Sequence, residues 1–184
     1  MSRLTRRSTR ITLVCVVALG AIVAGLMVWS STGVRLSSHT VVSLSRDRVW
    51  EFFVDPHNLA RWDRSVGRVE PTTAAPMGTG YTFDTISPGP DGEATRSSYR
   101  IEDFTPPHGA RVDLVGSPQF QRASWHTKLE PVAGGTRVVI EVEFAPKLGY
   151  FFLTPMLLLS RGNLMTDMTY LHDEIEAYAR RTPS

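Results

Sequence analysis

A long uncharged segment near the N-terminus constrains this chain more than any other feature of its sequence. Nineteen consecutive residues, 11–29, carry no charge, and only Thr12 adds a polar hydroxyl group. As an α-helix, this segment would be about 30 Å long, which matches the hydrocarbon core of a bilayer. Arginines precede it at positions 3, 6, 7 and 10. The sequence therefore predicts a basic tail (1–10), a transmembrane helix (11–29) and a soluble part.

Two interpretations of the apolar segment are open, an uncleaved anchor and a cleaved signal peptide. A signal peptide has an apolar core of about 7–15 residues followed by a small-residue cleavage site. This segment is longer and has no A-x-A site behind it, which favours the anchor. Trp29 suits the membrane–water boundary, and the arginines favour the cytoplasmic side for the tail. We therefore expect a single-pass protein of the cell membrane whose soluble domain is extracytoplasmic.

Charge and cysteine content narrow the function further. The formal charge of the chain is +2, and it becomes −2 without the four tail arginines, because no acidic residue precedes Asp47. No later run of Lys or Arg and no basic stripe with interleaved aromatic residues follows, so we expect no nucleic-acid partner. The only cysteine, Cys15, lies in the apolar segment, so the soluble domain has neither a disulfide nor a thiol nucleophile.

The soluble part begins with a predicted linker, a strand and two short helices. Residues 30–38 are polar and predict a linker, and residues 40–44 predict a strand. Ser45 is a suitable N-cap for a helix, which must end before Pro56 because proline disfavours helical backbone at the preceding residue. A second short helix is predicted over residues 56–62, with proline at its first position and an aspartate as its cap.

Five further segments alternate in hydropathy and are separated by turn residues, which predicts antiparallel strands. They are residues 81–86, 94–103, 110–115, 120–130 and 136–144. The proline- and glycine-rich residues 88–92 predict a hairpin loop, and Gly134-Gly135 predicts a tight turn.

The hairpins can be given a predicted register. With both glycines in the turn, the last hairpin pairs Leu129 with Ile140, Thr127 with Val142, Trp125 with Phe144, Lys128 with Glu141 and His126 with Glu143. The earlier hairpin places Tyr81, Phe83, Tyr99 and Ile101 on one face, and Asp84 and Arg96 on the other. Each ribbon thus has an apolar and a charged face, as a half-buried sheet requires.

The chain ends in a predicted amphipathic helix. Its apolar stripe consists of Leu164, Met168, Leu171, Ile175 and Tyr178, at helical spacing. The preceding residues 148–160 are strongly apolar, are interrupted by Pro155 and are too short to span a bilayer. We expect them to form one bent element with the helix. They either pack across the sheet opening or form an apolar lip that rests near the bilayer.

Four short stretches resemble a known family. Residues 45–53 (SRDRVWEFF) and 55–62 (DPHNLARW) are similar to the opening of the START-like (SRPBCC) superfamily, and 77–81 (MGTGY) and 134–138 (GGTRV) are similar to two of its strand junctions. This superfamily includes polyketide cyclase/dehydrases, Bet v 1-like proteins and lipid-transfer domains. The resemblance implies an α+β helix-grip fold, in which a curved antiparallel sheet wraps around a long C-terminal helix. We assign this domain to residues 39–181.

The fold of this family implies an elongated cavity between the sheet and the terminal helix. The residues expected to contact a ligand there are Tyr81, Phe83, Tyr99, Val112, Leu114, Trp125, Phe144, Phe151, Met156 and Met168. Aromatic and methionine side chains make apolar but adaptable pocket walls. The same side chains could instead fill a solid core, and both interpretations stay open.

Catalytic signals in the sequence are sparse. Tyr81, Tyr99 and His172 are the candidates for proton transfer inside a cavity. His126 and Glu143 could form a base and its orienting carboxylate, but the predicted register places both on the outer face. No histidines have metal-ligand spacing and no cofactor motif is present, so we expect neither a metal nor a cofactor.

These features support three hypotheses for the function. The first is a membrane-anchored domain that binds or transports a hydrophobic ligand, such as a lipid or a polyketide-like molecule. The second is a polyketide cyclase- or dehydratase-like enzyme. The third is a packed interaction domain without a ligand. The expected partners are the hydrophobic molecule and the membrane, which the protein would contact through Ile11–Trp29.

Overall fold

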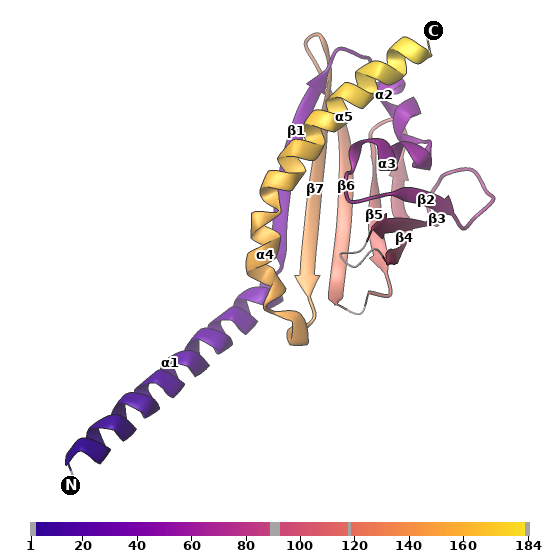
Figure 1. Ribbon diagram of the computed structural model, residues 1–184. Helices are drawn as coiled ribbons and strands as arrows, with labels where there is room; N and C mark the ends of the chain where they lie inside the picture. The colour runs from indigo at the N-terminus through magenta and orange to yellow at the C-terminus, as the bar shows by residue number, and fades with distance from the viewer. Residues whose placement is uncertain (1–2, 89–92, 118, 183–184) are drawn as a thin grey trace.

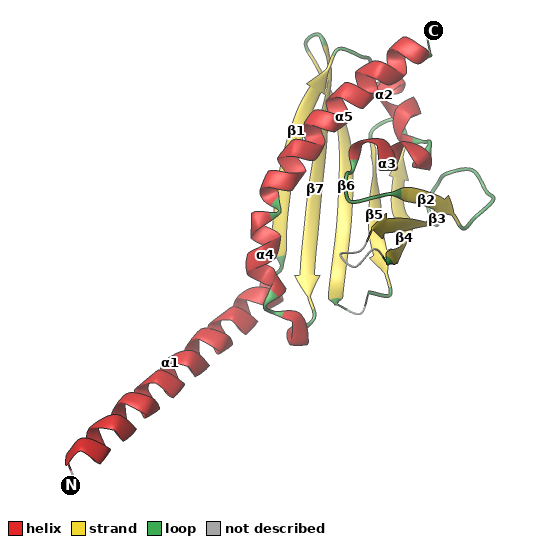
Figure 2. Cartoon of the chain, in the orientation of Figure 1, coloured by secondary structure: helices red, strands yellow, loops and turns green. Residues whose placement is uncertain are grey.

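A seven-stranded antiparallel sheet forms the body of the protein (Figures 1 and 2). This computed structural model describes residues 3–88, 93–117 and 119–182. The strands follow one another across the sheet in the order β1-β7-β6-β5-β4-β3-β2. Their bounds are β1 Val34–Val42, β2 Arg68–Pro71, β3 Thr82–Pro88, β4 Ala94–Thr105, β5 Gly109–Val115, β6 Phe120–Val132 and β7 Gly135–Pro146. Among these described strands, only β2 was not predicted from the sequence.

The helices lie along the sheet and at its ends. They are α1 Arg3–Thr32, α2 Arg46–Phe53, η1 Pro56–Asn58, α3 Leu59–Trp62, η2 Leu148–Tyr150, α4 Leu153–Leu159 and α5 Arg161–Arg181. Helices α4 and α5 follow one another along the length of the sheet (Figure 2). Helices α2 and α3 cover the part of the sheet that lies near the C-terminal half of α5. This arrangement confirms the α+β helix-grip fold predicted from the sequence.

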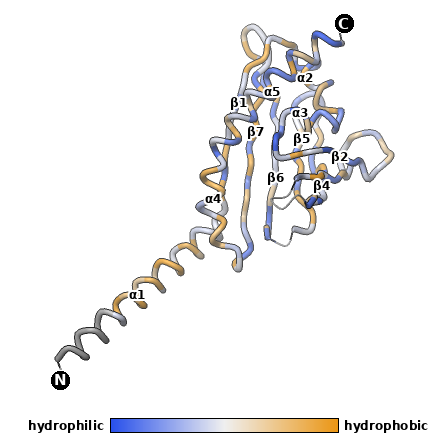
Figure 3. The backbone as a smooth tube through the Cα atoms, in the orientation of Figure 1, coloured by the Kyte–Doolittle hydropathy of each residue, from blue (hydrophilic) through white to orange (hydrophobic). Residues whose placement is uncertain are grey.

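Helix α1 projects away from the domain, as Figure 1 shows. Its residues Thr12–Ser30 have a mean hydropathy of 2.5, and no residue of this stretch before Ser30 is buried in the protein. Figure 3 shows the apolar character of this helix. Only its C-terminal end touches the domain, where Ser30 is 1% exposed and the helix contacts β7 and η2. By length and composition, α1 could cross a membrane.

The first strand begins earlier than the sequence predicts. Strand β1 starts at Val34, which pairs with Phe144 of β7, so it occupies part of the predicted linker 30–38. Val34 and Leu36 are both buried, and they alternate with the exposed Arg35. This short alternation of buried and exposed residues is the sequence signal for the start of β1. Because β1 starts at Val34 and α1 ends at Thr32, only Gly33 lies between them.

The helix–helix unit after β1 forms as predicted. Ser45 is the N-cap of α2, although its side chain makes no capping hydrogen bond. Asp55 caps η1 by accepting a hydrogen bond from the backbone N–H of His57 at 3.0 Å. The Asn58 side chain then donates to the Phe52 carbonyl oxygen at 2.8 Å, which ties the end of α2 to the following turn.

The register predicted for the last hairpin is wrong by two residues. Leu129 pairs with Val138 and Trp125 with Val142, so only Gly134, with a φ of 84°, adopts a turn conformation that favours glycine. Gly135 belongs to the strand, where a Cβ atom would lie 1.9 Å from the Val42 carbonyl oxygen. This close approach of β1, rather than the turn, requires the second glycine.

A shift of two residues keeps the faces of the predicted hairpin, because strand side chains alternate with a period of two. Lys128 therefore still reaches Glu141, at 2.7 Å, whereas Glu143 binds Arg122 rather than His126.

The faces predicted for the earlier hairpin are confirmed, because Phe83 lies opposite Tyr99. Asp84 and Arg96, which were predicted to share the other face, form an ion pair at 2.5 Å. Within the predicted loop 88–92, residues 89–92 lie outside the described part of the chain.

Candidate functional site

A cavity of about 360 Å³ lies between the concave face of the sheet and the helices. Side chains of α2, η1, α3, the start of α5 and six of the strands form its wall. Its walls are mainly apolar, with Leu36, Phe53, Val66, Ile140 and Leu164 among the lining residues. The sheet and the terminal helix therefore enclose an unfilled space rather than a continuous core.

A row of aromatic rings crosses the sheet along one side of this cavity. The rings of Phe83, Tyr99, Trp125 and Phe144 all line it. Successive ring centroids are 5.5, 5.4 and 5.5 Å apart. These distances and the stacked or edge-to-face angles are typical of favourable aromatic pairs. Because the rings contact one another along the surface of the sheet, they line the cavity without closing it. Val112 of β5 lies in the same wall.

Four of the other residues expected at the ligand lie outside the lining. Met168 is 3% exposed and packs in the core beside the cavity. Leu114 is half-buried on β5, and Phe151 is half-buried after η2. Met156 of α4 is 63% exposed and faces outward.

Of the three proton-transfer candidates, the structure brings only Tyr99 to the cavity. Tyr81 is buried in a neighbouring cluster with Val69 and Ile101. Burial raises the pKa of its hydroxyl, and the charge of Asp55 raises it further. His172 lies on the outer surface of α5, where its ring nitrogen is 3.1 Å from Asp173.

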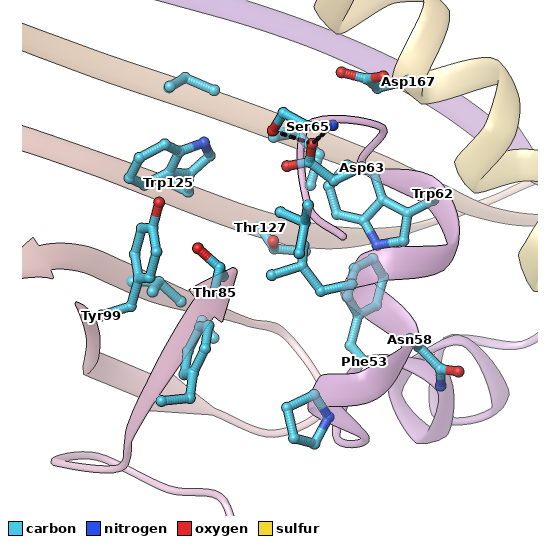
Figure 4. A pocket seen from close by; sticks show the side chains of 18 of the residues that line it. Phe53, Asn58, Trp62, Asp63, Ser65, Thr85, Tyr99, Trp125, Thr127 and Asp167 are labelled. Carbon is cyan, nitrogen blue, oxygen red and sulfur yellow. Dashed lines mark hydrogen bonds between the residues drawn. The ribbon is translucent and has the colours of Figure 1, made fainter. Parts of the chain in front are cut away.

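The cavity also contains residues that sequence reasoning missed. Trp50 and Trp62, which are not among the residues expected from the sequence to contact a ligand, both line it. Polar groups join them from several elements: Asn58, Asp63, Ser65, Thr85, Thr127 and Asp167 (Figure 4). Asp167 follows Leu164 by three residues on the buried stripe of the helix, so an acidic residue in an apolar stripe was a visible signal. Asp63 lies in a loop and gave no comparable signal.

Two carboxylates, Asp63 and Asp167, lie at the same side of the cavity (Figure 4). Asp63 Oδ1 accepts hydrogen bonds from the Ser65 backbone N–H at 2.9 Å and from the Ser65 hydroxyl at 2.6 Å. Burial raises the pKa of Asp167, and the nearby charge of Asp63 raises it further, although Arg64 opposes both effects. Part of the Asp167 population is therefore protonated at a higher pH than for a free aspartate.

Tyr99 places a hydroxyl group within the aromatic row. Burial raises the pKa of this hydroxyl, and a hydrogen bond with Thr85 lowers it in part. The charge of Asp63 raises the same pKa. Tyr99 therefore stays neutral at physiological pH and can donate a hydrogen bond to a molecule in the cavity.

The charges of the lining are all of one sign. Asp55, Asp63 and Asp167 line the cavity, and none of the described residues that line it is a lysine or an arginine. The guanidinium group of Arg64 instead lies over the ring of Tyr170, 5.2 Å from its centroid. Within residues 3–88, 93–117 and 119–182, no group of three or more His, Cys, Asp or Glu side chains is arranged to hold a metal ion.

An apolar cavity between a curved antiparallel sheet and a long C-terminal helix defines the helix-grip class of small-molecule-binding domains. The sequence agrees with this class. Residues 33–166 match the polyketide cyclase/dehydrase and lipid transport family, and the chain belongs to that family. The resemblance to the START-like superfamily is thereby confirmed. Among curated proteins, none has a sequence that matches this chain.

Several solved structures share the fold at low sequence identity. The ZhuI aromatase/cyclase from Streptomyces sp. R1128 is 17% identical with a TM-score of 0.66, over 82% of this chain and 97% of that one. TTHA0849 from Thermus thermophilus is 18% identical with a TM-score of 0.63, over 78% and 98% of the two chains. The protein Ara h 8.0201 is 13% identical with a TM-score of 0.59, over 79% and 99%. At these identities the likeness establishes the fold alone.

Proposed function

We propose that this protein binds and transports a hydrophobic small molecule, a lipid or a polyketide-like compound, while anchored in the cell membrane. The observation that carries the proposal is the cavity of about 360 Å³ with its row of aromatic rings. Ligand sites in proteins have volumes of about 300–1,000 Å³ and mostly apolar walls. Burial of apolar ligand surface, at about 25 cal/mol per Å², would supply the affinity. A packed domain without a ligand would have no use for such a space.

The polar groups of the lining favour one kind of ligand. Asp63 and Asp167 would repel a carboxylate or phosphate placed beside them, since no lysine or arginine of the described lining compensates their charge. A hydroxyl or an amine would instead find hydrogen-bond acceptors there. The proposed ligand is therefore an apolar molecule with a neutral or positively charged polar end.

Helix α1 would act as the anchor. Thr12–Ser30 is long and apolar enough to cross a bilayer, and Ser30 at its end is buried against the domain. The contact between the C-terminal end of this helix and the domain supports an uncleaved anchor over a signal peptide. The arginines before it place the domain outside the cytoplasm by the positive-inside rule. The intact mass of the purified protein tests whether α1 is cleaved, because cleavage would reduce the mass below 20.5 kDa.

Native mass spectrometry of the full chain, purified from its own cells in a mild detergent, tests the binding proposal. We expect a bound apolar molecule on the wild-type protein. Ala110 lines the cavity and Ala94 is an exposed strand residue outside it, so Ala110→Phe should lose the molecule whereas Ala94→Phe should keep it. A wild-type protein that carries nothing, and whose melting temperature no apolar compound raises, would support the ligand-free interaction domain.

The preference for a polar end can be tested with matched compounds. Dodecylamine, dodecanol and dodecanoic acid share one chain and differ only in the head group. We expect the acid to bind least tightly to the wild-type protein. Asp63→Asn should reduce the ratio of dissociation constants between the acid and the other two compounds by about tenfold, which corresponds to one charged hydrogen bond.

The raised pKa values of Asp167 and Tyr99 favour an enzyme as the second candidate function. Both groups line the same cavity, and a carboxyl group that keeps its proton to a higher pH than a free aspartate could act as a general acid toward a bound carbonyl compound. Product analysis after incubation with a polyketide-type substrate distinguishes the two functions. A carrier returns the substrate unchanged, whereas a cyclase or dehydratase returns a product that Asp167→Asn fails to form.

A further inference from the structure

One end of the domain exposes an unusually apolar surface. Most of the large hydrophobic side chains exposed outside α1 belong to η2, α4 and the start of α5: Leu148, Phe152, Met156, Leu158, Leu159 and Met165. Met156 is 63% exposed and Leu159 is 81% exposed. Solitary apolar residues on a surface are common, but a continuous group of them marks an interaction site. We call residues 148–159 the apolar segment.

The pattern within the apolar segment is that of a helix at a membrane surface. Phe152, Met156 and Leu159 are spaced by four and three residues, so they share one face of the helical segment. Residues 148–160 contain no charged side chain, and Lys147 and Arg161 flank them on either side. An exposed apolar face between two flanking cations can lie in the interfacial layer of a bilayer, with the apolar side chains toward the acyl chains and the cations toward the head groups.

The connection to α1 fixes where this surface must lie. Only Gly33 separates α1 from β1, and the first residue of β1, Val34, pairs with Phe144 near the end of β7. Strand β7 ends at Pro146 and leads directly into η2, which also contacts α1. Figure 1 shows α1 leaving the domain at the end where α4 lies.

We propose that the apolar segment lies in the interfacial layer of the same bilayer that α1 crosses. This inference rests on the proposed anchor. From Ser30, the last residue of the apolar stretch of α1, to Val34 the chain can span at most about 14 Å. The polar layer on each side of a bilayer is about 5–8 Å thick. The short tether therefore holds the end of the domain at the lipid surface, where exposed apolar side chains are stabilised by burial.

The cavity begins close to this contact. Ser160, Asn163 and Leu164 line it, and Ser160 is the residue that follows α4. The proposed membrane contact therefore adjoins one end of the cavity wall.

Site-specific labelling of the full chain tests this proposal. In a Cys15→Ser background, single cysteines at Met156→Cys and Leu159→Cys receive an environment-sensitive fluorophore. Val41→Cys is the matched control, because Val41 is 45% exposed near the opposite end of β1. The proteins are reconstituted in phosphatidylcholine–phosphatidylglycerol vesicles, and quenching by spin-labelled lipid is compared with quenching by soluble iodide. The native Cys15, labelled in the unaltered chain, reports whether α1 enters the bilayer.

We expect lipid quenching and a blue-shifted emission at positions 156 and 159, and iodide quenching alone at position 41. If Cys15 is quenched by lipid but positions 156 and 159 behave like position 41, this inference is overturned and the anchor stands. If Cys15 is not quenched by lipid, the anchor fails and the inference fails with it. Shielding from iodide without lipid quenching would indicate a protein neighbour, such as a second copy, and would also overturn the proposal.

A second pair of variants separates membrane contact from folding. Met156→Glu and Leu159→Glu place charges on exposed positions, so the circular dichroism spectrum should stay unchanged. With the fluorophore at Phe152→Cys, these charges should abolish the lipid quenching, because they oppose insertion of the shared apolar face. Val41→Glu should leave it intact.

Discussion

The two halves of helix α5 face the same sheet but meet very different interiors. In the C-terminal half, Leu171 and Ile175 are fully buried and pack with Phe52 of α2 in a continuous core. In the N-terminal half, Leu164 and Asp167 border the cavity of about 360 Å³. The difference shows that neither the sheet nor the helix produces the hollow. It lies under the N-terminal half of α5, where side chains of α2 border the space between sheet and helix without filling it.

The two halves also treat carboxylates in opposite ways. Glu176 in the packed half accepts hydrogen bonds from the backbone N–H and the hydroxyl group of Ser43, both at 2.8 Å, and these bonds lower its pKa. Asp167 in the hollow half has a raised pKa because it is buried beside Asp63. The packed half thus stabilises a charge that holds β1 and α5 together, whereas the hollow half keeps a charge at an energetic cost, as functional sites often do.

The largest expected difference between the halves concerns stability. Leu171→Ala removes a fully buried side chain from the packed half and should lower the free energy of unfolding by about 2–5 kcal/mol. Met165→Ala, at a 59% exposed position of the same helix, should change it by less than about 0.5 kcal/mol. Denaturant unfolding followed by tryptophan fluorescence measures both. Equal effects of the two substitutions would contradict the distinction drawn between the halves.

A smaller effect is expected in the hollow half, and on the ligand rather than on the fold. Tyr99→Phe removes the hydroxyl from the aromatic row and should weaken ligand binding by about 0.5–1.5 kcal/mol, the value of one hydrogen bond. Tyr81→Phe, at a buried tyrosine outside the cavity, should leave the affinity unchanged. Competition for the bound molecule in native mass spectrometry measures this difference. If both tyrosines matter equally, the cavity is not the binding site.

Glu176→Gln should weaken the packed half in a pH-dependent manner. Because the pKa of Glu176 is lowered in the folded protein, its contribution is present above the unfolded pKa of about 4.3 and is lost as the pH falls through the folded pKa. The partial exposure of the group limits the expected loss at pH 7 to about 0.5–1 kcal/mol. The difference in the free energy of unfolding between variant and wild type should therefore be larger at pH 7 than at pH 3. Asp173→Asn, on the exposed face, serves as the control.

Asp167→Asn should give the smallest change, and in the opposite direction. Because the pKa of Asp167 is raised, the native protein binds this proton more tightly than the unfolded chain, and stability falls as the pH rises from the unfolded to the folded pKa. Asparagine cannot ionise, so the variant lacks the free-energy cost of a buried charge. It should be slightly more stable than the wild type at pH 7, but not at pH 3. A loss of stability at pH 7 would mean that the Asp167 carboxylate holds the helix in place, as Glu176 does.

Much of the fold was accessible from the sequence because local signals determine it. The caps of α2 and η1, the strand alternation and the apolar stripe of α5 depend on neighbouring residues in the chain, and each predicts its element. These local signals gave wrong or incomplete predictions where a residue contacts a segment that is distant in the chain. Gly135 suggests a turn but is needed for the approach of β1, and β1 itself begins within a segment that is polar overall.

The site was accessible only in part. The aromatic residues Phe83, Tyr99, Trp125 and Phe144 could be placed because strand periodicity puts them on the concave face. Met168 and Leu114 share the same kind of pattern, yet they lie outside the lining. Periodicity gives the direction of a side chain but not the distance to whatever faces it across the cavity.

Hydropathy, capping and turn residues act over a few positions, and they were enough to predict the apolar N-terminal helix, the order of all described elements except β2, and the family. The tertiary structure alone decided that a hollow remains under the first half of α5, that Asp63 and Asp167 meet there, and that α4 lies beside the end of α1. Each of these depends on how segments far apart in the chain fill, or leave unfilled, a shared volume. No local sequence pattern predicts how these segments pack.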